Sequence, residues 1–293
     1  MSFLKDGECI KEICIFTKKN SVKKVFKLTR LLLAVAFSLS FAGCNFIQNP
    51  DSPDKKNEKT LPNDFFVNSV LYNYYTAEYK ALSYQAFNAA SDYLELLKFK
   101  NPKEKEMAIV LDIDETLLDN SPYQARLYEI NASYDSLWNH WCNLAEAKAI
   151  PGAVDFLNFA DSLGFNIFYI SNRKEKYVFE STLKNMKDEG FPQVDSLHFL
   201  LRTEGNSKEN RRMKVAQNYR VVMLVGDNIG DFYEDTADYQ QRDKTVSAMK
   251  DDFGRKLIVL PNAIYGNWVE SLGLESKADL DSLIAIMTKP FTI

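Results

Sequence analysis

The sequence has few cysteines, and their positions exclude a protein held together by disulfides. Its 293 residues contain four, of which Cys9, Cys14 and Cys44 lie in or beside an amino-terminal segment that we interpret below as a targeting signal. Only Cys142 belongs to the rest of the chain, so it has neither a disulfide partner nor a second thiol at metal-ligand spacing. We therefore expect Cys142 to be a small buried hydrophobic residue.

Histidine is equally scarce, and the common nucleotide-binding motifs are absent. His140 and His198 are the only two histidines, and neither lies in a nucleophile motif, so a Ser-His triad finds little support and both are predicted to be structural. The chain has no Walker phosphate loop and no G-x-G-x-x-G, which disfavours P-loop hydrolysis and a Rossmann cofactor. A formal charge of -4 with a pI near 5.5 argues against a general nucleic-acid binder.

An apolar stretch near the amino terminus is too short to span a bilayer comfortably. It covers residues 31–42, follows a basic segment, and ends in Phe41-Ala42-Gly43-Cys44. The basic residues are Lys18, Lys19, Lys23, Lys24, Lys27 and Arg30. This arrangement resembles a bacterial lipoprotein signal, which implies cleavage of residues 1–43 and lipidation of Cys44. An uncleaved membrane anchor is the alternative.

Both interpretations predict an exported protein tied to a membrane. For a lipoprotein we expect the outer membrane, at its periplasmic or its surface face. Residues 44–64 are rich in Asn, Pro, Asp and Lys, and are predicted to form a flexible tether. The remaining chain, residues 65–293, is predicted to be the folded domain.

Short apolar runs alternate with helical patterns through this domain. The predicted strands are residues 108–111, 165–170, 197–201, 220–225 and 256–260, and the predicted helices between them are 152–163, 174–189 and 208–218. Strand, helix, strand at this spacing is typical of parallel βαβ units with right-handed crossovers. The sequence therefore predicts an α/β fold, with a parallel sheet buried between helices on both faces.

Two segments depart from this alternation. Residues 65–97 show apolar residues at helical spacing, and we expect their stripe to pack on the domain, an exposed stacking surface being the alternative. The stripe consists of Phe66, Val70, Tyr74, Ala77, Ala81, Tyr84, Phe87 and Ala90. The second segment, about 121–150, is an aromatic insertion that follows the first strand of the sheet, and is predicted to be a small helical cap over a site.

Acidic residues follow the first predicted strand of the sheet, where residues 109–120 read I-V-L-D-I-D-E-T-L-L-D-N. Asp112 and Asp114 lie at i and i+2, so both side chains can point into one pocket as the strand breaks. Polar residues also follow three later strands. They are Ser171-Asn172-Arg173, Asn206-Ser207-Lys208, and Gly226-Asp227 through Asp231. If the sheet is parallel, all four groups meet at its carboxyl edge, where open α/β sheets bind ligands.

Such a cluster of carboxylates repels itself unless a cation neutralises it, and oxygen ligands with waters suit Mg²⁺. An EF-hand calcium loop is excluded because Leu117 and Tyr123 replace the required Gly and Glu. The remaining chemistry is carboxylate attack on a phosphoryl group. One Asp attacks phosphorus, and a second, two residues on, protonates the leaving oxygen and later activates water.

These residues resemble a known family. The run Asp112-Ile-Asp114-Glu-Thr116, then Ser171-Asn172, Lys208, and Gly226-Asp227 through Asp231 are similar to the four motifs of the haloacid dehalogenase superfamily. More narrowly, L-D-N-S-P-Y from Leu118, P-G-A-V-D-F-L from Pro151, S-N-R from Ser171, G-D-N-x-x-D-F from Gly226 and L-P-N-x-x-Y-G-x-W from Leu260 resemble the class C acid phosphatases. These are exported bacterial lipoproteins of the lipoprotein e, 5′-nucleotidase type, and the resemblance covers about residues 101–268.

The resemblance assigns roles to individual residues. It implies that Asp112 is the nucleophile and Asp114 the general acid/base. It implies that Mg²⁺ is held by Asp112, the backbone carbonyl of Asp114 and Asp227, with Asp231 holding a metal-bound water. Ser171 or Asn172, together with Lys208, would bind the phosphoryl oxygens. Lys208 also suits this role because it opens a predicted helix, whose amino end attracts anions.

The family stacks an aromatic group on the nucleoside base, and the matching positions are Tyr134, Trp138 and Tyr265. Core packing is the alternative for Trp138 and Tyr265, and packing is our prediction for Trp141, one helical turn from Trp138. Glu115 and Asp119 gain no partners from these motifs and are expected to be structural.

We therefore predict a membrane-anchored, Mg²⁺-dependent acid phosphatase for small phosphate esters, with nucleoside 5′-monophosphates or nicotinamide mononucleotide favoured. The alternatives are a sugar-phosphate phosphatase or phosphotransferase, and a non-enzymatic ligand-binding or adhesin lipoprotein. No nucleic-acid partner is expected, and a homodimer is left open.

Overall fold

Five parallel strands form the central sheet, and they occur where the apolar runs predict them. They are β1 (Met107–Leu111), β4 (Asn166–Lys174), β5 (Phe199–Arg202), β6 (Arg220–Gly226) and β7 (Leu257–Val259). Their order across the sheet is β5-β4-β1-β6-β7, and each pair of neighbours runs parallel. The strand that carries the acidic motif therefore lies in the middle of the sheet.

The computed structural model describes residues 63–132, 137–234, 238–272 and 277–288, all of which belong to the unit Lys59–Ile293. The predicted signal segment, Cys44 and nearly all of the predicted tether lie outside the described residues. No helix within these ranges combines the length and the apolarity that crossing a membrane requires.

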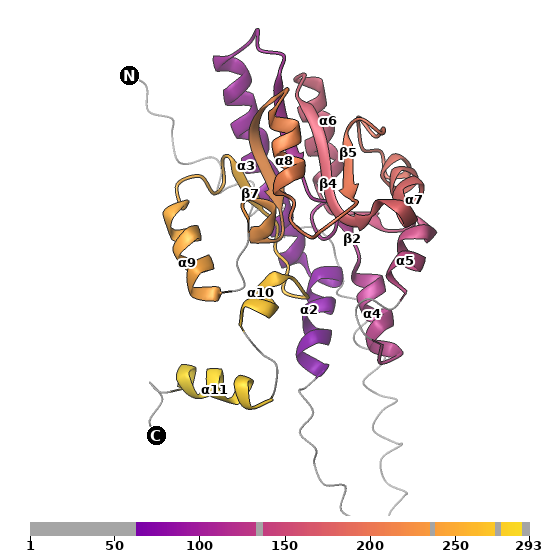
Figure 1. Ribbon diagram of the computed structural model, residues 1–293, viewed down its shortest axis with the longest axis vertical. Coiled ribbons are helices and arrows are strands. Elements are labelled where there is room, and N and C mark those ends of the chain that lie inside the picture. Colours follow the sequence, from indigo (N-terminus) through magenta and orange to yellow (C-terminus); the bar gives the residue numbers. More distant parts are fainter. Residues whose placement is uncertain (1–62, 133–136, 235–237, 273–276, 289–293) are drawn as a thin grey trace, which may run out of the picture. The chain divides into compact units, whose positions relative to one another are not determined.

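The sheet is covered on both faces, and its central strand β1 is apolar at every position. All five residues of β1 are buried. Met107, Ile109 and Leu111 belong to the larger core with residues of helices α3 (Ala77–Lys100), α6 (Ala153–Ser162) and α7 (Glu175–Asp188). Ala108 and Val110 belong to a second core on the opposite face. That second core includes Val215 of α8 (Glu209–Ala216), and Figure 1 shows α8 on the opposite side of the strands from α3 and α6.

The helices that link the strands follow the predicted alternation. Helix α6 precedes β4, α7 leads from β4 to β5, α8 leads from β5 to β6, and α9 (Tyr239–Ala248) precedes β7. Each crossover brings the chain back to the end of the sheet at which the strands begin, as parallel pairing requires. The α/β fold expected from the sequence is therefore observed.

The amino-terminal helical segment is two helices, and its buried face agrees with the predicted stripe only in part. Helix α2 (Asn63–Tyr75) ends before Thr76, whose hydroxyl accepts a hydrogen bond from the backbone of Tyr79 and caps α3. Tyr74 and Tyr84, both in the predicted stripe, are 46% and 49% exposed. The buried residues of α3 are Tyr79, Ser83, Phe87, Ala90 and Leu94, of which Phe87 and Ala90 belong to the predicted stripe. The predicted stripe was therefore right at Phe87 and Ala90 and wrong in the first half of α3, where Tyr79 and Ser83 are buried rather than Ala81 and Tyr84.

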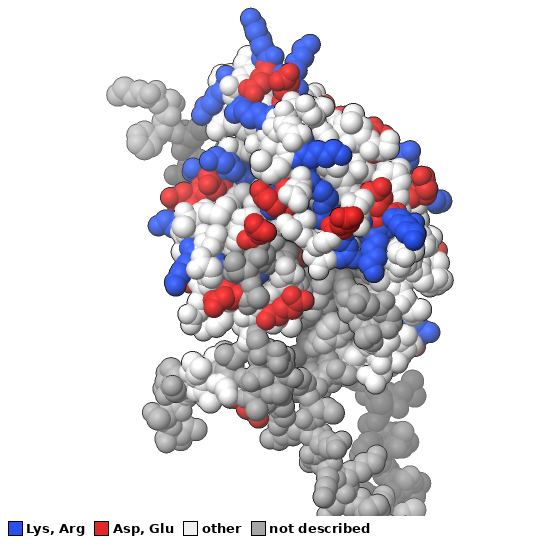
Figure 2. Space-filling view, viewed as in Figure 1, with Lys and Arg blue, Asp and Glu red and all other residues white. Residues whose placement is uncertain are grey.

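The insertion that follows β1 contains short elements. These are β2 (Leu118–Asp119), α4 (Ser121–Glu129), α5 (Trp138–Leu144) and β3 (Lys148–Ala149), with β2 and β3 paired antiparallel. Helix α4 contacts α2, and α5 contacts α7. After β7 the chain continues into α10 (Asn267–Ser271) and α11 (Lys277–Thr288). On the face drawn in Figure 2, basic and acidic side chains are interspersed.

Candidate active site

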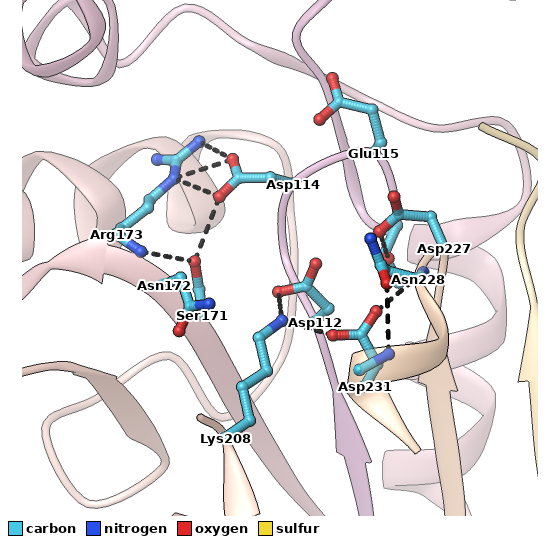
Figure 3. Close-up of polar contacts among 12 residues, drawn as sticks. Asp112, Asp114, Glu115, Ser171, Asn172, Arg173, Lys208, Asp227, Asn228 and Asp231 are labelled. Atoms are coloured by element: carbon cyan, nitrogen blue, oxygen red, sulfur yellow. Dashed lines mark hydrogen bonds and ion pairs between the residues drawn. The ribbon is translucent and has the colours of Figure 1, made fainter. Parts of the chain in front are cut away.

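Asp112 is the first residue after β1, and a lysine from a neighbouring crossover reaches it. Lys208, the residue before α8, places its Nζ 2.5 Å from Asp112 Oδ1 and 2.6 Å from Asp231 Oδ1. Asp112 and Asp231 are 8% and 6% exposed, so these two carboxylates and the lysine between them are largely shielded from solvent. Figure 3 shows the lysine pointing from below towards both carboxylates. The carboxyl edge of the sheet thus brings together three of the predicted residues.

Asp231 is delivered by a turn that follows β6. Its carboxylate accepts the backbone N–H of Asn228 at 2.9 Å, and the Asn228 side chain accepts the N–H of Gly230, which forms a capping box on the short helix η1 (Ile229–Asp231). Arg212 of α8 donates to the carbonyl of Asp231 at 2.8 Å. The carboxylate folds back over Gly226, where a Cβ atom would overlap it. Glycine is therefore required at this position for Asp231 to reach the site.

Asp227 also follows β6, and two neutral side chains fix its carboxylate. Thr116 Oγ1 donates to Asp227 Oδ1 at 3.1 Å, and Asn262 Nδ2 donates to Asp227 Oδ2 at 2.8 Å. Thr116 comes from the D-x-D-x-T motif, and Asn262 from the loop after β7. Three strand ends therefore hold this one carboxylate in place.

Burial and mutual repulsion perturb the ionisation of this cluster. Burial raises the pKa of Asp112 well above its usual range, Lys208 opposes that rise, and Asp231 and Asp227 add to it. Burial, followed by repulsion from Asp231, raises the pKa of Asp227 to about 7. Burial alone would lower the pKa of Lys208, but Asp112 and Asp231 together raise it above its usual value. The positive charge of Lys208 is therefore not enough to offset the negative charges of the three carboxylates.

Three of the acids are arranged to hold a cation. Asp112, Asp227 and Asp231 each offer a carboxylate oxygen, and these oxygens lie within 4.8 Å of one another. A hard divalent ion prefers such an all-oxygen set and would remove the repulsion that raises the pKa of Asp227. The donor set therefore fits a divalent metal. The carboxylate of Asp114 is not part of it.

Asp114 turns away from Asp112 and faces a buried arginine, as Figure 3 shows. Arg173 Nη2 and Nε donate to Asp114 Oδ1 at 2.8 and 3.0 Å. Ser171, predicted to bind phosphate, donates its hydroxyl to Asp114 Oδ2 at 3.1 Å. Arg173 and Ser171 both belong to β4, which pairs directly with β1. The two motif aspartates therefore occupy different surroundings.

Asn120 joins the insertion to this arginine pair. Its Nδ2 donates to Asp114 Oδ1 at 3.0 Å and to Glu115 Oε2 at 3.3 Å, while its Oδ1 accepts the indole N–H of Trp141 at 2.8 Å. Trp141 is thus more than the packing residue that we predicted. Glu115, buried and with a left-handed backbone at φ 57°, also accepts the Asn120 backbone N–H. Burial raises its pKa well above the usual range.

Asn172 is tied down by groups on both sides. Its Oδ1 accepts a hydrogen bond from Arg211 Nη2 at 2.5 Å, and its Nδ2 donates to the carbonyl of Asn206 at 3.0 Å. Arg211 also donates to the carbonyls of Ser171 and Leu200, at 2.5 and 3.2 Å. This arginine of α8 therefore links β4, β5 and the loop that carries Lys208.

The aromatic positions are placed unevenly. Tyr134 lies outside the described residues. Trp138 is half-buried, and the centre of its ring lies 5.7 Å from Arg173 Cζ. Its ring also meets that of Tyr123 edge-on, with the two ring centroids 5.0 Å apart. The structure therefore shows Trp138 packed on the arginine. Tyr265, also half-buried, follows Asn262 in the loop that holds Asp227, and its carbonyl accepts the indole N–H of Trp268.

The sequence between residues 47 and 268 matches the family described as HAD superfamily, subfamily IIIB (Acid phosphatase). The match covers most of the chain and all of the site residues described above. The chain belongs to this family.

Solved structures agree with this membership. The crystal structure of class C acid phosphatase from Bacillus anthracis with tungstate bound is 37% identical, with a TM-score of 0.71, and the alignment covers 76% of this chain and 96% of that chain. A second structure of the Bacillus anthracis class C acid phosphatase is 38% identical with a TM-score of 0.70, over 76% and 95% of the two chains. The predicted resemblance and fold class are therefore confirmed.

Plant proteins are more distant relatives. The stem 28 kDa glycoprotein of Glycine max is 29% identical over 168 residues, which is 54% of this chain and 61% of that protein. Acid phosphatase 1 of Solanum lycopersicum is 26% identical over 139 residues, or 45% and 54% of the two chains. The chain spans between about half and three-fifths of these curated relatives. At the level of the family, the expected class of phosphoric monoester hydrolases is confirmed.

Several site residues received no role from the sequence. Arg173 directly follows Ser171-Asn172, Asn120 lies in L-D-N-S-P-Y, and Asn262 lies in L-P-N-x-x-Y-G-x-W. Each therefore lies in a motif that carried the family resemblance. Arg211 had only the nearby lysine as a signal. Attention to every polar residue of the matched motifs, rather than to the acids alone, would have found three of the four.

Proposed function

We propose that this family member hydrolyses small phosphate monoesters through a phosphorylated Asp112. The observation that carries the proposal is the contact of Asp112 with Lys208 at 2.5 Å, in a buried cluster with Asp227 and Asp231. A carboxylate is a weak nucleophile that needs neighbouring positive charge when its target is an anionic phosphate. Lys208 and the cation that the carboxylates can hold supply that charge.

Two displacements complete the reaction. First, a carboxylate oxygen of Asp112 attacks phosphorus, the ester P–O bond breaks, and Asp114 gives its proton to the leaving oxygen. Then Asp114 takes a proton from water, the water oxygen attacks phosphorus, and the bond from phosphorus to Asp112 breaks to release inorganic phosphate. Lys208 binds the phosphoryl oxygens throughout, with Ser171 or Asn172 as a further donor.

Magnesium is the metal that we propose for this site. Asp112 and Asp227 would bind it directly with the backbone carbonyl of Asp114, and Asp231 would hold one of its waters. The three carboxylates fit a hard ion with few protein ligands, which is the usual mode of Mg²⁺. When bound, the ion offsets the charge between the nucleophile and the phosphate.

The substrates that we favour are nucleoside 5′-monophosphates or nicotinamide mononucleotide. The similar Bacillus anthracis phosphatase has been crystallised with tungstate bound, which like phosphate is a tetrahedral oxyanion, and this supports the proposal that the present chain also binds an oxyanion. Trp138 and Tyr265 lie on the elements that flank that edge, and Tyr134 is the third proposed aromatic contact. A panel of nucleotides and sugar phosphates tests the preference, since turnover only of sugar phosphates would favour that rival substrate class.

Replacement of the nucleophile tests the mechanism. We expect Asp112→Asn to lose phosphatase activity, because the amide neither attacks phosphorus nor balances Lys208. Release of phosphate from p-nitrophenyl phosphate is the measurement, and Asp195→Asn, at an exposed carboxylate that pairs with His198, is the matched control. Retained activity in Asp112→Asn would rule out the phosphorylated aspartate. Activity that persists after exhaustive chelation would rule out the metal.

We further propose that the protein is exported and held at a membrane by lipid on Cys44, with the outer membrane as the expected site. The basic segment, the apolar stretch at residues 31–42 and the Ala42-Gly43-Cys44 ending support this proposal. The partners would then be the membrane and a small phosphate ester.

A further inference from the structure

The carboxylate of Asp114 is saturated with donors in a position from which it does not face Asp112 (Figure 3). Its Oδ1 accepts from Arg173 Nη2, Arg173 Nε and Asn120 Nδ2, at 2.8, 3.0 and 3.0 Å. Its Oδ2 accepts from Ser171 Oγ at 3.1 Å. A carboxylate has about four acceptor positions, so these contacts leave little capacity for water.

Arg173 is itself held by two residues other than Asp114. It is 1% exposed, its Nη1 donates to Thr182 Oγ1 at 3.2 Å, and its Cζ lies 5.7 Å from the centre of the Trp138 ring. Removal of one partner from a buried ion pair leaves an uncompensated charge and is strongly destabilising. Because Thr182 and the Trp138 ring hold Arg173 independently of Asp114, the guanidinium defines the direction of the Asp114 side chain.

The orientation of Asn120 is fixed by a tryptophan of the insertion. An indole N–H only donates, so the Asn120 oxygen must face Trp141 and its amide nitrogen must face Asp114 and Glu115. Both tryptophans of this array, Trp138 and Trp141, lie on α5. One short helix of the insertion thus braces both Arg173 and Asn120.

We propose that Arg173 and Asn120 are positioning residues for Asp114, and that α5 sets their geometry through Trp138 and Trp141. The inference rests on the proposed function, in which Asp114 carries the proton. The array holds the carboxylate at one side of the pocket, and its loss leaves the carboxylate without a defined position. The defect should therefore affect proton transfer to the leaving group more than phosphate binding.

Leaving-group dependence separates this role from a general structural one. The value of kcat/KM reports the steps through cleavage of the ester bond. A nitrophenolate leaves with little help from an acid, whereas an alkoxide requires a proton. We expect Arg173→Lys to lower kcat/KM for glycerol phosphate about 10- to 100-fold more than for p-nitrophenyl phosphate, since a positioned general acid contributes about 10²- to 10⁴-fold. Trp141→Phe removes only the hydrogen-bond donor to Asn120. We expect it also to lower kcat/KM more for glycerol phosphate than for p-nitrophenyl phosphate, but by a smaller factor.

Controls distinguish the possible failures. Arg220→Lys, at an exposed pair with Glu104 remote from the site, should leave the ratio of the two kcat/KM values unchanged. Equal losses on both substrates, or no loss on either, in Arg173→Lys would overturn the positioning role. If that variant does not fold, as judged by its thermal unfolding, the ratio for Trp141→Phe decides by the same criterion. A wild-type protein that hydrolyses neither ester would instead overturn the proposed function itself.

Discussion

Gly226 decides whether Asp231 can reach the site. The Asp231 side chain folds over the Gly226 backbone, and a Cβ atom at residue 226 would overlap it. From this position Asp231 contacts Lys208 and contributes to the cluster of three carboxylates. Because residue 226 has no side-chain methyl group, Asp231 can take its place beside Lys208 and the other carboxylates.

We accordingly expect Gly226→Ala to lower kcat/KM about 100-fold, because a displacement of about 1 Å at a site can reduce the rate by this factor. The change adds one methyl group at the end of a buried strand, so spectroscopic folding should persist and the steady-state kinetics are the measurement. Gly254→Asn is the control, because asparagine tolerates the φ of 77° at residue 254 and the space there is open. Full activity in Gly226→Ala would show that Asp231 is dispensable.

Ionisation of Asp227 links metal binding to pH. The pKa of this residue, raised to about 7 by burial and by Asp231, is above its value of 3.8 in an unfolded chain. The folded protein without metal therefore binds the proton more tightly, and the contribution of Asp227 to its stability is greatest at low pH and falls as the pH rises through about 7. A metal ion must displace that proton when the solution is acidic.

Mg²⁺ at a fixed concentration should therefore raise Tm more at about pH 7.5 than at about pH 5, because fewer protons compete with the metal. Differential scanning fluorimetry with and without Mg²⁺ gives the two shifts. Asp227→Asn should largely remove the difference between them, whereas Asp252→Asn, at an exposed pair with Lys256, should keep it. A larger shift at the acidic pH would contradict the role of Asp227 as a metal ligand.

Side-chain chemistry was predictable from the sequence to different degrees at different residues. Asp112, Lys208, Asp227 and Asp231 follow strands that all end at one edge, so their meeting could be inferred from the strand pattern alone. The direction of the Asp114 carboxylate could not, because it depends on competition between Arg173 and the pocket. Alternation along a strand predicts the face on which a side chain lies, but it does not predict which hydrogen-bond partners that side chain has.

At the scale of elements, α8 has two functions in assembling the site. Lys208, immediately before it, contacts the carboxylates of Asp112 and Asp231. Arg212, one turn into the helix, is buried and donates to the carbonyls of Gly230 and Asp231. The helix therefore fixes Asp231 through both its side chain and its backbone. Its predicted bounds, 208–218, were close to the observed ones, Glu209–Ala216.

The buried face of helix α3 was predicted only in part. Phe87 is 2% exposed and stacks on Phe156 of α6, with ring centroids 5.4 Å apart. Tyr84, assigned to the same stripe, is 49% exposed. Tyrosine combines an apolar ring with a polar hydroxyl, so helical spacing alone does not place it inside or outside.

Truncation of the buried ring should therefore destabilise the domain strongly. We expect Phe87→Ala to lower the free energy of unfolding by about 3–5 kcal/mol, the usual range for a buried phenylalanine. Leu82→Ala on the same helix, at a side chain that is 42% exposed, should change it by about 0.5 kcal/mol or less. Urea denaturation of both variants gives the comparison, and similar losses would mean that the observed face of α3 is wrong.

At the scale of the whole molecule, two kinds of sequence signal serve different purposes. The α/β pattern with its strand-end motifs specifies the domain, and the structure and the family match confirm that reading. The predicted amino-terminal signal concerns the destination of the protein and lies outside the described residues. Hydrophobic periodicity predicts packing, whereas a lipidation signal is recognised by processing enzymes and leaves no mark on the core.

Export and anchoring can be tested without reference to the fold. We expect Cys44→Ser to abolish incorporation of labelled fatty acid and to retain residues 1–43, because the modified thiol is lost and processing follows it. Labelling of cells followed by mass measurement of the purified chain gives both results. Cys14→Ser, in the same segment, should leave both unchanged. Continued lipid labelling of Cys44→Ser would contradict the assignment, and absence of labelling in the wild type would favour an uncleaved anchor.

The strand order also has a consequence for how activity arises in time. β1 is central, but its neighbours β4 and β6 come much later in the chain, and β6 is the strand that leads to Asp227 and Asp231. Pairing at such sequence separations is slow, because a long loop must close before any contact forms. A nascent or partly folded chain that has not added β6 therefore holds the nucleophile without the other acids of the cluster. Catalysis should emerge only when the sheet closes, so a chain that crosses a membrane unfolded would hydrolyse nothing until it reached its destination.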